Sequence, residues 1–251
     1  MCSAVLLISC AGTPTPTTAS TCKNLLSSVE VQDFDDVWRV ISSLPKKVDV
    51  FETGAELSSR QAPILQNMDD RYLVKMRLTS HFVQYDSDKQ ILIIPTAALA
   101  MTSVSQFDLQ TAFGAEHPIV RNSFSLSKSD TTSIGTFIGE NAFGLQMDVR
   151  EDTRIVRSVA EVSAAGNGGF RGNAFELSLP PQEARSVSEQ GFWSIMFTPK
   201  PPYWGRVDDV DQASISYPVE TTSEERILVG DIECLVLHGP DGGPLAIVGT
   251  V

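Results

Sequence analysis

The sequence predicts an α+β domain built mainly of antiparallel β-strands, sandwich-like or an open sheet, with one clear N-terminal helix and one short helix near residues 180–190. Three observations predict this class. One early segment repeats apolar residues at three- and four-residue spacing, and several later segments alternate apolar with polar residues. Apolar residues make up 42% of the 251 residues, as in globular chains that bury a core of ordinary size.

The early helix is expected between Asp33 and Pro45. Aspartates crowd its first turn, where the helix dipole favours negative charge, and Pro45 cannot continue a helix. Residues three and four positions apart form one apolar face, which we expect to pack on the core: Phe34, Val37, Trp38, Ile41 and Leu44.

A first hairpin is expected from alternation with period two. It joins residues 72–82 to residues 91–94 through a turn at Asp86-Ser87-Asp88. Pro95 ends the second strand because proline cannot donate a hydrogen bond to a sheet.

A second hairpin is expected to join residues 143–149 to residues 154–162 through a turn at Glu151-Asp152. A short helix then opens at Pro180-Pro181, since proline suits the first turn, and closes at Gly191. The remaining strands are expected at residues 175–179, 192–198, 227–237 and 245–248.

The first residues form an uncharged apolar run that ends in a cysteine. The run Leu7-Ile8-Ser9-Cys10 resembles the lipobox of bacterial lipoproteins, with leucine three positions before the cysteine and a small residue directly before it. The resemblance implies a signal segment at residues 1–9 and a lipid on Cys10, palmitate among its acyl chains, that holds the protein at a membrane. Nine residues, none basic, precede Cys10, whereas a signal peptide normally begins with a basic region and runs about 15–30 residues, so we expect a segment shortened at its start.

The residues after Cys10 are small, uncharged and rich in proline and threonine as far as Thr21. Such a composition cannot bury enough apolar surface to fold. We therefore expect three regions: a signal-like segment at 1–9, a lipidated cysteine with a flexible tether at 10–22, and a single strand-rich globular domain at 23–251.

Cys22 and Cys234 are candidates for a disulfide. If Cys2 leaves with the signal and Cys10 carries lipid, they are the two thiols that remain in a compartment expected to be oxidising. The alternative is that Cys234 is a small buried apolar residue and Cys22 a free thiol in the tether.

Composition and motifs exclude several classes of function. The formal net charge of −12 argues against nucleic-acid binding, because neutralising phosphates needs a basic face. No G-x-S-x-G, H-E-x-x-H, P-loop or EF-hand motif occurs, and no two cysteines have the spacing of a zinc pair. We therefore expect no metal, no cofactor and no catalytic residue that the sequence can name.

The histidines and the acidic run are expected at the surface. His81 falls on the polar side of the predicted strand 72–82, His117 precedes a proline, and His238 begins a turn rich in glycine. The run Asp208–Asp211 lacks the glycine and the later glutamate of a calcium loop, so we expect a solvated turn there.

One segment suggests a binding loop, from Thr198 to Arg206. Its prolines stiffen the chain, so less entropy is lost on binding. Tyr203 and Trp204 combine apolar area with a polar tip, as interface anchors do, and Arg206 could stack or pair beside them. The alternative is a long loop fixed by burying its own tryptophan.

These observations favour a non-catalytic lipoprotein of the bacterial cell envelope, facing the periplasm or the exterior, that binds a partner protein or an envelope polymer. The alternative is a secreted hydrolase whose site is assembled from distant loops, because a catalytic triad is recognised by geometry and not by sequence. An enzyme should show a deep cleft with converging polar groups, and a binding protein an apolar patch or groove.

We predict that Cys10 is acylated in a bacterium that processes lipoproteins, when the gene is expressed with its upstream codons. Mass spectrometry of the mature N-terminus should show a lipid on Cys10, and Cys10→Ala should abolish the lipid and membrane retention. Cys22→Ala is the matched control and should keep both. An unprocessed N-terminus that begins at Met1 would contradict the prediction.

Overall fold

The computed structural model of the chain is described over residues 19–48, 51–95, 120–125, 130–140, 143–162 and 173–249. These residues form mainly strands, in one sheet of eight strands and one of three, with few helices. The mainly β class expected from the sequence is confirmed at this coarser level. The large sheet is mixed, because two of its strand pairs are parallel.

Two long strands run through the whole large sheet. β9 (Phe192–Asp211) and β10 (Val219–His238) have 20 residues each and pair antiparallel from one end to the other. At about 3.3 Å per residue, each spans about 65 Å. The other strands therefore add to different parts of one shared pair.

The order of strands is β1-β2-β9-β10-β7-β5, with β11 also on β10 and β6 also on β7. Their bounds are β1 Val31–Gln32, β2 Tyr72–Arg77, β5 Val120–Ser125, β6 Asp130–Glu140, β7 Gln146–Val162 and β11 Pro244–Gly249.

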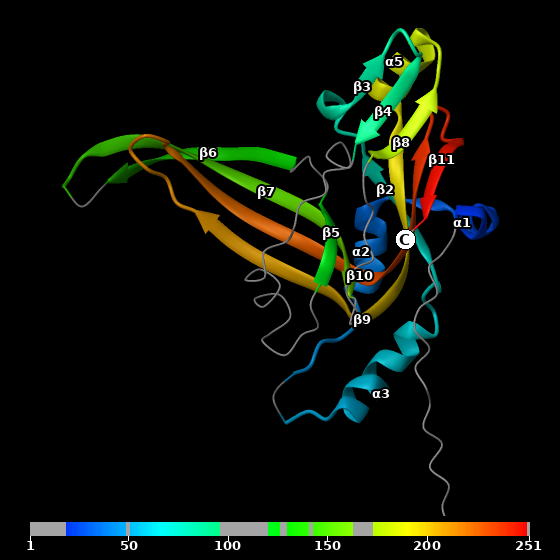
Figure 1. Cartoon of the computed structure of the whole chain (residues 1–251). Coiled ribbons are helices and arrows are strands. Elements are labelled where there is room, and N and C mark those ends of the chain that lie inside the picture. The colour runs from blue at the N-terminus through cyan, green and yellow to red at the C-terminus, as the bar shows by residue number, and fades with distance from the viewer. Residues whose placement is uncertain are drawn as a thin grey trace, which may run out of the picture.

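The two halves of the long pair belong to different parts of the molecule. β2 and β11 pair with residues 192–197 and 234–238, and this half, which carries the helices, is the body. Residues 130–140, 143–157 and 204–226 form the other half, a four-stranded sheet in the order β9-β10-β7-β6, which we call the arm. Figure 1 shows the arm projecting away from the body, with the turn between β9 and β10 at the far end.

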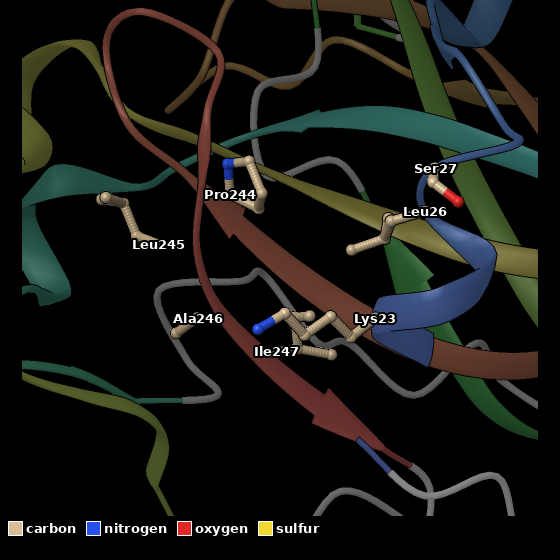
Figure 2. A pocket seen from close by; sticks show the side chains of 7 residues that line it. All are labelled: Lys23, Leu26, Ser27, Pro244, Leu245, Ala246 and Ile247. Atoms are coloured by element: carbon tan, nitrogen blue, oxygen red, sulfur yellow. The ribbon is translucent and has the colours of Figure 1, made fainter. Parts of the chain in front are cut away.

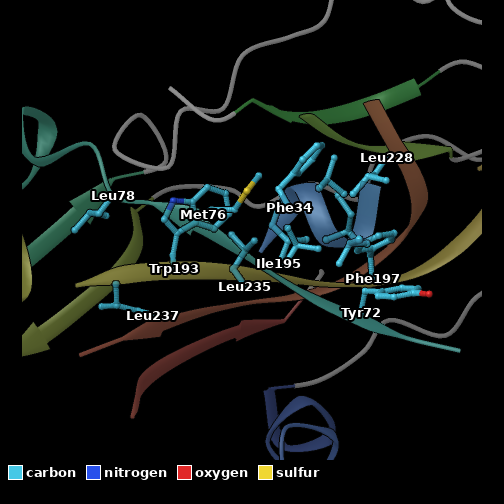
Figure 3. Close-up of a cluster of buried hydrophobic side chains, with 14 of the residues drawn as sticks. Phe34, Tyr72, Met76, Leu78, Trp193, Ile195, Phe197, Leu228, Leu235 and Leu237 are labelled. Carbon is cyan, nitrogen blue, oxygen red and sulfur yellow. The ribbon is translucent and has the colours of Figure 1, made fainter. Parts of the chain in front are cut away.

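The main core lies between the body sheet and α2 (Phe34–Ile41). Figure 3 shows the side chains of Trp193, Ile195 and Phe197 from β9 gathered with those of neighbouring strands around this helix. Most of the cluster is inaccessible to solvent, and each fully buried side chain of this size stabilises the fold by roughly 1.5–3 kcal/mol. The apolar helix face expected from the sequence is confirmed by the burial of Phe34, Val37 and Ile41.

The opposite face of the body is covered by α1 (Ala19–Leu25). Residues 73 and 74 are neighbours on β2, so their side chains point to opposite faces: Val74 joins the core under α2, and Leu73 joins a smaller cluster under α1. A disulfide between Cys22 and Cys234 lies in this smaller cluster, with Cα atoms 6.4 Å apart. The bond fixes α1 to the body half of β10.

The small sheet consists of β3 (Gln84–Asp86), β4 (Ile91–Pro95) and β8 (Asn173–Ser178), all antiparallel. α5 (Pro181–Gln190) follows β8 and ends at Gly191, as the sequence predicted. Buried residues of β4 and α5 contribute to the main core, so the small sheet extends the body.

The first predicted hairpin is wrong. Residues 72–77 pair with β9 in the large sheet, and a 3-10 helix (Ser80–Phe82) carrying His81 separates them from β3. The turn at residues 86–88 does form a hairpin, but it joins β4 to β3. In the sequence, apolar and polar residues alternate through residue 82. Residues 72–77 are separated from β3 because they pair with β9, and local alternation does not specify the partner strand.

The second predicted hairpin is also wrong. β7 continues from residue 146 to 162 without a turn at Glu151-Asp152, because both residues pair with β6 on one side and β10 on the other. The partner strand β6 precedes it, over residues where no element was expected from the sequence.

Other elements differ from expectation in extent. α3 (Gly54–Leu65), with a capping box between Thr53 and Glu56, was not predicted, and it buries none of its residues fully. α1 begins at Ala19, inside the segment expected to be a flexible tether. The run Asp208–Asp211, expected as a turn, forms the end of β9.

We predict that Cys22→Ala destabilises the fold by about 2–5 kcal/mol, because the bond closes a loop of 212 residues and the chain-entropy model gives about 5 kcal/mol as its upper range. Urea unfolding of the oxidised protein would measure the change. Cys10→Ala, which leaves the bond intact, is the control and should leave the unfolding midpoint unchanged. Equal midpoints for Cys22→Ala and the parent chain would contradict the prediction.

Candidate functional site

Exposed apolar side chains concentrate on the arm. Among the described residues, fourteen large apolar side chains are exposed, and eight of them lie in the arm. Scattered exposed apolar residues are ordinary, but a concentration at one end of a molecule typically marks an interaction surface. The eight are Ile134, Phe137, Ile138, Phe143, Leu145, Val210, Ile215 and Tyr217.

β6 contributes most to this surface because of its position. It pairs with β7 on one side only and has no described strand on its other side. Almost every side chain from Asp130 to Glu140 is exposed, on both faces of the strand. The sequence signal was present between these two residues, in an uncharged stretch with threonine, isoleucine and phenylalanine, which are typical strand formers.

Ion pairs join the base of the arm to α2. Asp35 accepts hydrogen bonds from Arg157 of β7 at 3.0 and 2.8 Å and from Arg226 of β10 at 3.2 Å. Arg157 also binds Asp130 at 2.6 Å, and Arg226 binds Glu224 at 2.7 Å. Carboxylates and guanidinium groups held this way restrict how the arm can move relative to the helix.

Two of these paired residues of the arm, together with Asp35, also line a groove beside α2. It has a volume of about 660 Å³ and is lined by charged groups, Asp35, Asp130 and Arg157 among them. Hydrogen bonds from Arg157 lower the pKa of Asp35, so this carboxyl stays ionised and is unsuited to act as a general acid at neutral pH.

The segment expected as a binding loop is part of β9. Pro199 faces Gly230 and Trp204 faces Leu228, so residues 200–203 lie opposite Val229 alone. The prolines therefore interrupt the ladder without ending the strand, and the expected loop from residue 198 to 206 is wrong. A proline has no N–H to donate, which is why these residues leave the regular register.

The three proposed anchors of that segment have different partners. The Trp204 indole N–H donates to the Leu44 carbonyl at 2.9 Å, and its ring is partly buried in the core against Trp38. Tyr203 packs against the same core. Arg206 instead pairs with Asp208 on the arm, at 2.9 Å. This favours the alternative considered for the segment, in which it is fixed by its own tryptophan.

His238 is not in an exposed turn, contrary to expectation. It is the last residue of β10, 3% exposed, and its ring stacks on Phe192. Nδ1 lies 3.0 Å from the Gly242 carbonyl, which can only accept, so Nδ1 carries the proton. Nε2 then accepts from the Ser194 hydroxyl at 2.7 Å. No sequence pattern links two residues 44 positions apart.

This serine–histidine pair has the tautomer of a catalytic dyad but not the access. Ser194 is 0% exposed, so a substrate cannot reach its hydroxyl in this conformation. Burial lowers the pKa of His238, which keeps the imidazole neutral and the pair satisfied inside the body. The pair acts here as a buried polar contact between β9 and β10.

A hollow of about 600 Å³ lies between α1 and β11, and Figure 2 shows the side chains that line it. It is mostly apolar, and Lys23 is its one charged group, so it lacks the converging polar groups of an enzyme cleft. The lining residues are Lys23, Leu26, Ser27, Pro244, Leu245, Ala246 and Ile247.

The cysteines and histidines named from sequence have these positions. The structure brings Cys22 and Cys234 together in a disulfide, whereas Cys10 and His117 lie outside the described residues. In the described part of the chain, no cluster of three His, Cys, Asp or Glu side chains could hold a metal ion. Over the same residues, no helix is long and apolar enough to cross a membrane.

Comparison with models of known families, with curated proteins and with solved structures gave no match to this chain.

We predict that the protein loses stability as the pH falls below about 6.5, because the unfolded His238 gains a proton near this ordinary pKa while the buried imidazole resists it. His238→Gln should reduce the difference between unfolding free energies measured at pH 7.5 and pH 5.5. His81→Gln, at an exposed histidine, is the control and should keep the pH dependence of the parent chain. The same pH dependence in all three proteins would show that His238 does not contribute.

Proposed function

We propose that this chain is a lipid-tethered, non-catalytic protein of the bacterial cell envelope, and that the end of its arm binds a partner protein or an envelope polymer. The observation that carries the binding role is the concentration of exposed apolar side chains on the arm. The tether and the location rest on the run that ends at Cys10.

The position of the arm suits this role. α1, which begins within the predicted tether, and the end of the arm lie at opposite sides of the molecule (Figure 1). A body held at a membrane near α1 therefore leaves the arm free to reach a partner. The ion pairs of Asp35 support the arm at its base, so less entropy is lost when its end binds.

A secreted hydrolase is the second candidate, and the Ser194–His238 pair is the observation that favours it. Its hydroxyl would have to become accessible before it could attack a substrate. In the charged groove beside α2, Asp35 and Asp130 are already paired with Arg157. The accessible apolar arm therefore supports a binding role better than the sealed pair supports catalysis.

Photocrosslinking in the native envelope tests the binding role. We expect a benzoylphenylalanine at position 217, in place of exposed Tyr217 on the arm, to form a covalent adduct with a partner. The same group at position 82, in place of exposed Phe82 on the body, is the matched control and should form none. Equal adducts at both positions, or none at position 217, would contradict binding through the arm.

A further inference from the structure

We infer that β6 binds an extended, basic segment of a partner protein, which pairs with it as an added strand of the arm sheet. This inference rests on the proposed binding role of the arm and names its site and the chemistry of its partner.

The two edges of the arm differ in how they resist strand addition. The β9 edge carries Arg206, Asp208, Asp209 and Asp211 and follows three prolines, and both charges and prolines discourage pairing with another chain. The β6 edge has no charge and no proline between Asp130 and Glu140. One edge is thus protected, and the other is left suited to accept a strand.

The usable part of the β6 edge is regular. A bulge at Ile134 interrupts the register with β7, but residues 135–140 pair without a break with residues 151–146. Phe137 and Ile138 are neighbours and point to opposite faces, and they are 40% and 69% exposed. An added strand would cover both side chains, one on each face of the sheet.

Charge identifies the kind of segment. The arm contains eleven Asp and Glu residues and five Arg residues, a net charge of −6. All five arginines already form ion pairs within the arm or with Asp35. Carboxylates on β7, the strand next to β6, such as Asp148 opposite Ile138 and Glu151 opposite Gly135, thus favour lysine or arginine in the partner.

The same charges disfavour a second copy of the chain. Two β6 strands that paired antiparallel about Gly135 would place Asp130 of one copy opposite Glu140 of the other. They would also bring together two arms of net charge −6. Like charges directly opposite each other destabilise a strand pair.

The test is binding of a labelled nine-residue peptide, alternating threonine with valine or isoleucine between terminal lysines, to the full chain by fluorescence anisotropy. We expect the basic peptide to bind at least about tenfold more tightly than a version with glutamate in place of lysine. A basic peptide with proline at two alternate threonines should also bind about tenfold more weakly than the parent basic peptide, because proline has no N–H to donate to the ladder. Equal binding of the proline or glutamate version, or no binding of the basic peptide, would overturn the inference.

Two variants locate the site. Ile138→Lys should weaken binding of the basic peptide about tenfold, whereas Val210→Lys, which adds the same charge at an exposed position of β9, should change it less than about threefold. Thr136→Lys is a second variant on β6, with thermal unfolding as the check that each protein folds. Equal loss from Ile138→Lys and Val210→Lys would overturn a site on β6.

Two further outcomes separate this inference from the function on which it rests. A dimer in sedimentation that Ile138→Lys dissociates would give the edge to a second copy and overturn the inference. An adduct at position 217 that persists in Ile138→Lys, with no peptide binding by the parent chain, would leave the arm as a binding surface and reject strand addition.

Discussion

The antiparallel pairing of β9 with β10 is the constraint on which the rest of the structure depends. From Phe192 opposite His238 to Asp211 opposite Thr221, this one pair supplies the centre of the body and the centre of the arm. Neither half is a closed unit, because β2, β7 and β11 all depend on an edge of this pair for their hydrogen bonds. The disulfide of Cys22 anchors α1 to β10 at the middle of its body half.

The junction between body and arm shows how the pair changes direction without ending. Val229 stands opposite residues 200–203. Beside it, Gly230 lies so close to β9 that an added Cβ atom would clash with the Thr198 carbonyl oxygen. Trp204 then donates a hydrogen bond to the carbonyl of Leu44, three residues after the end of α2. The proline-rich segment thus serves the junction, and the surface available for a partner lies farther out.

The proposed role combines a body that is cross-linked by a disulfide with an arm that is accessible to a partner. In the body, polar and apolar groups find their partners inside the fold. Ser194 bonds to His238, the His238 ring stacks on Phe192, and the buried apolar side chains form two clusters. On the arm, ion pairs with arginines neutralise part of the acidic charge, whereas the large apolar side chains of β6 remain exposed. The proposed binding site therefore depends on a difference between the two edges of the arm sheet: the β9 edge is charged, and the β6 edge is not charged between Asp130 and Glu140.

The sequence by itself determined the features that arise from neighbouring residues. The helix from Phe34, the helix closed by Gly191 and the alternation of the main strands follow from local spacing, capping and turn residues, which need no knowledge of the partner. Tertiary structure decided which strand pairs with which. β2 pairs with β9 and not with residues 91–94, β7 passes through Glu151-Asp152, and His238 becomes buried beside Ser194. These outcomes depend on contacts between residues distant in sequence, where alternation specifies only which face of a strand is buried. The same holds for the arm: composition describes β6 as a strand, but only the arrangement of the sheet places it at an edge.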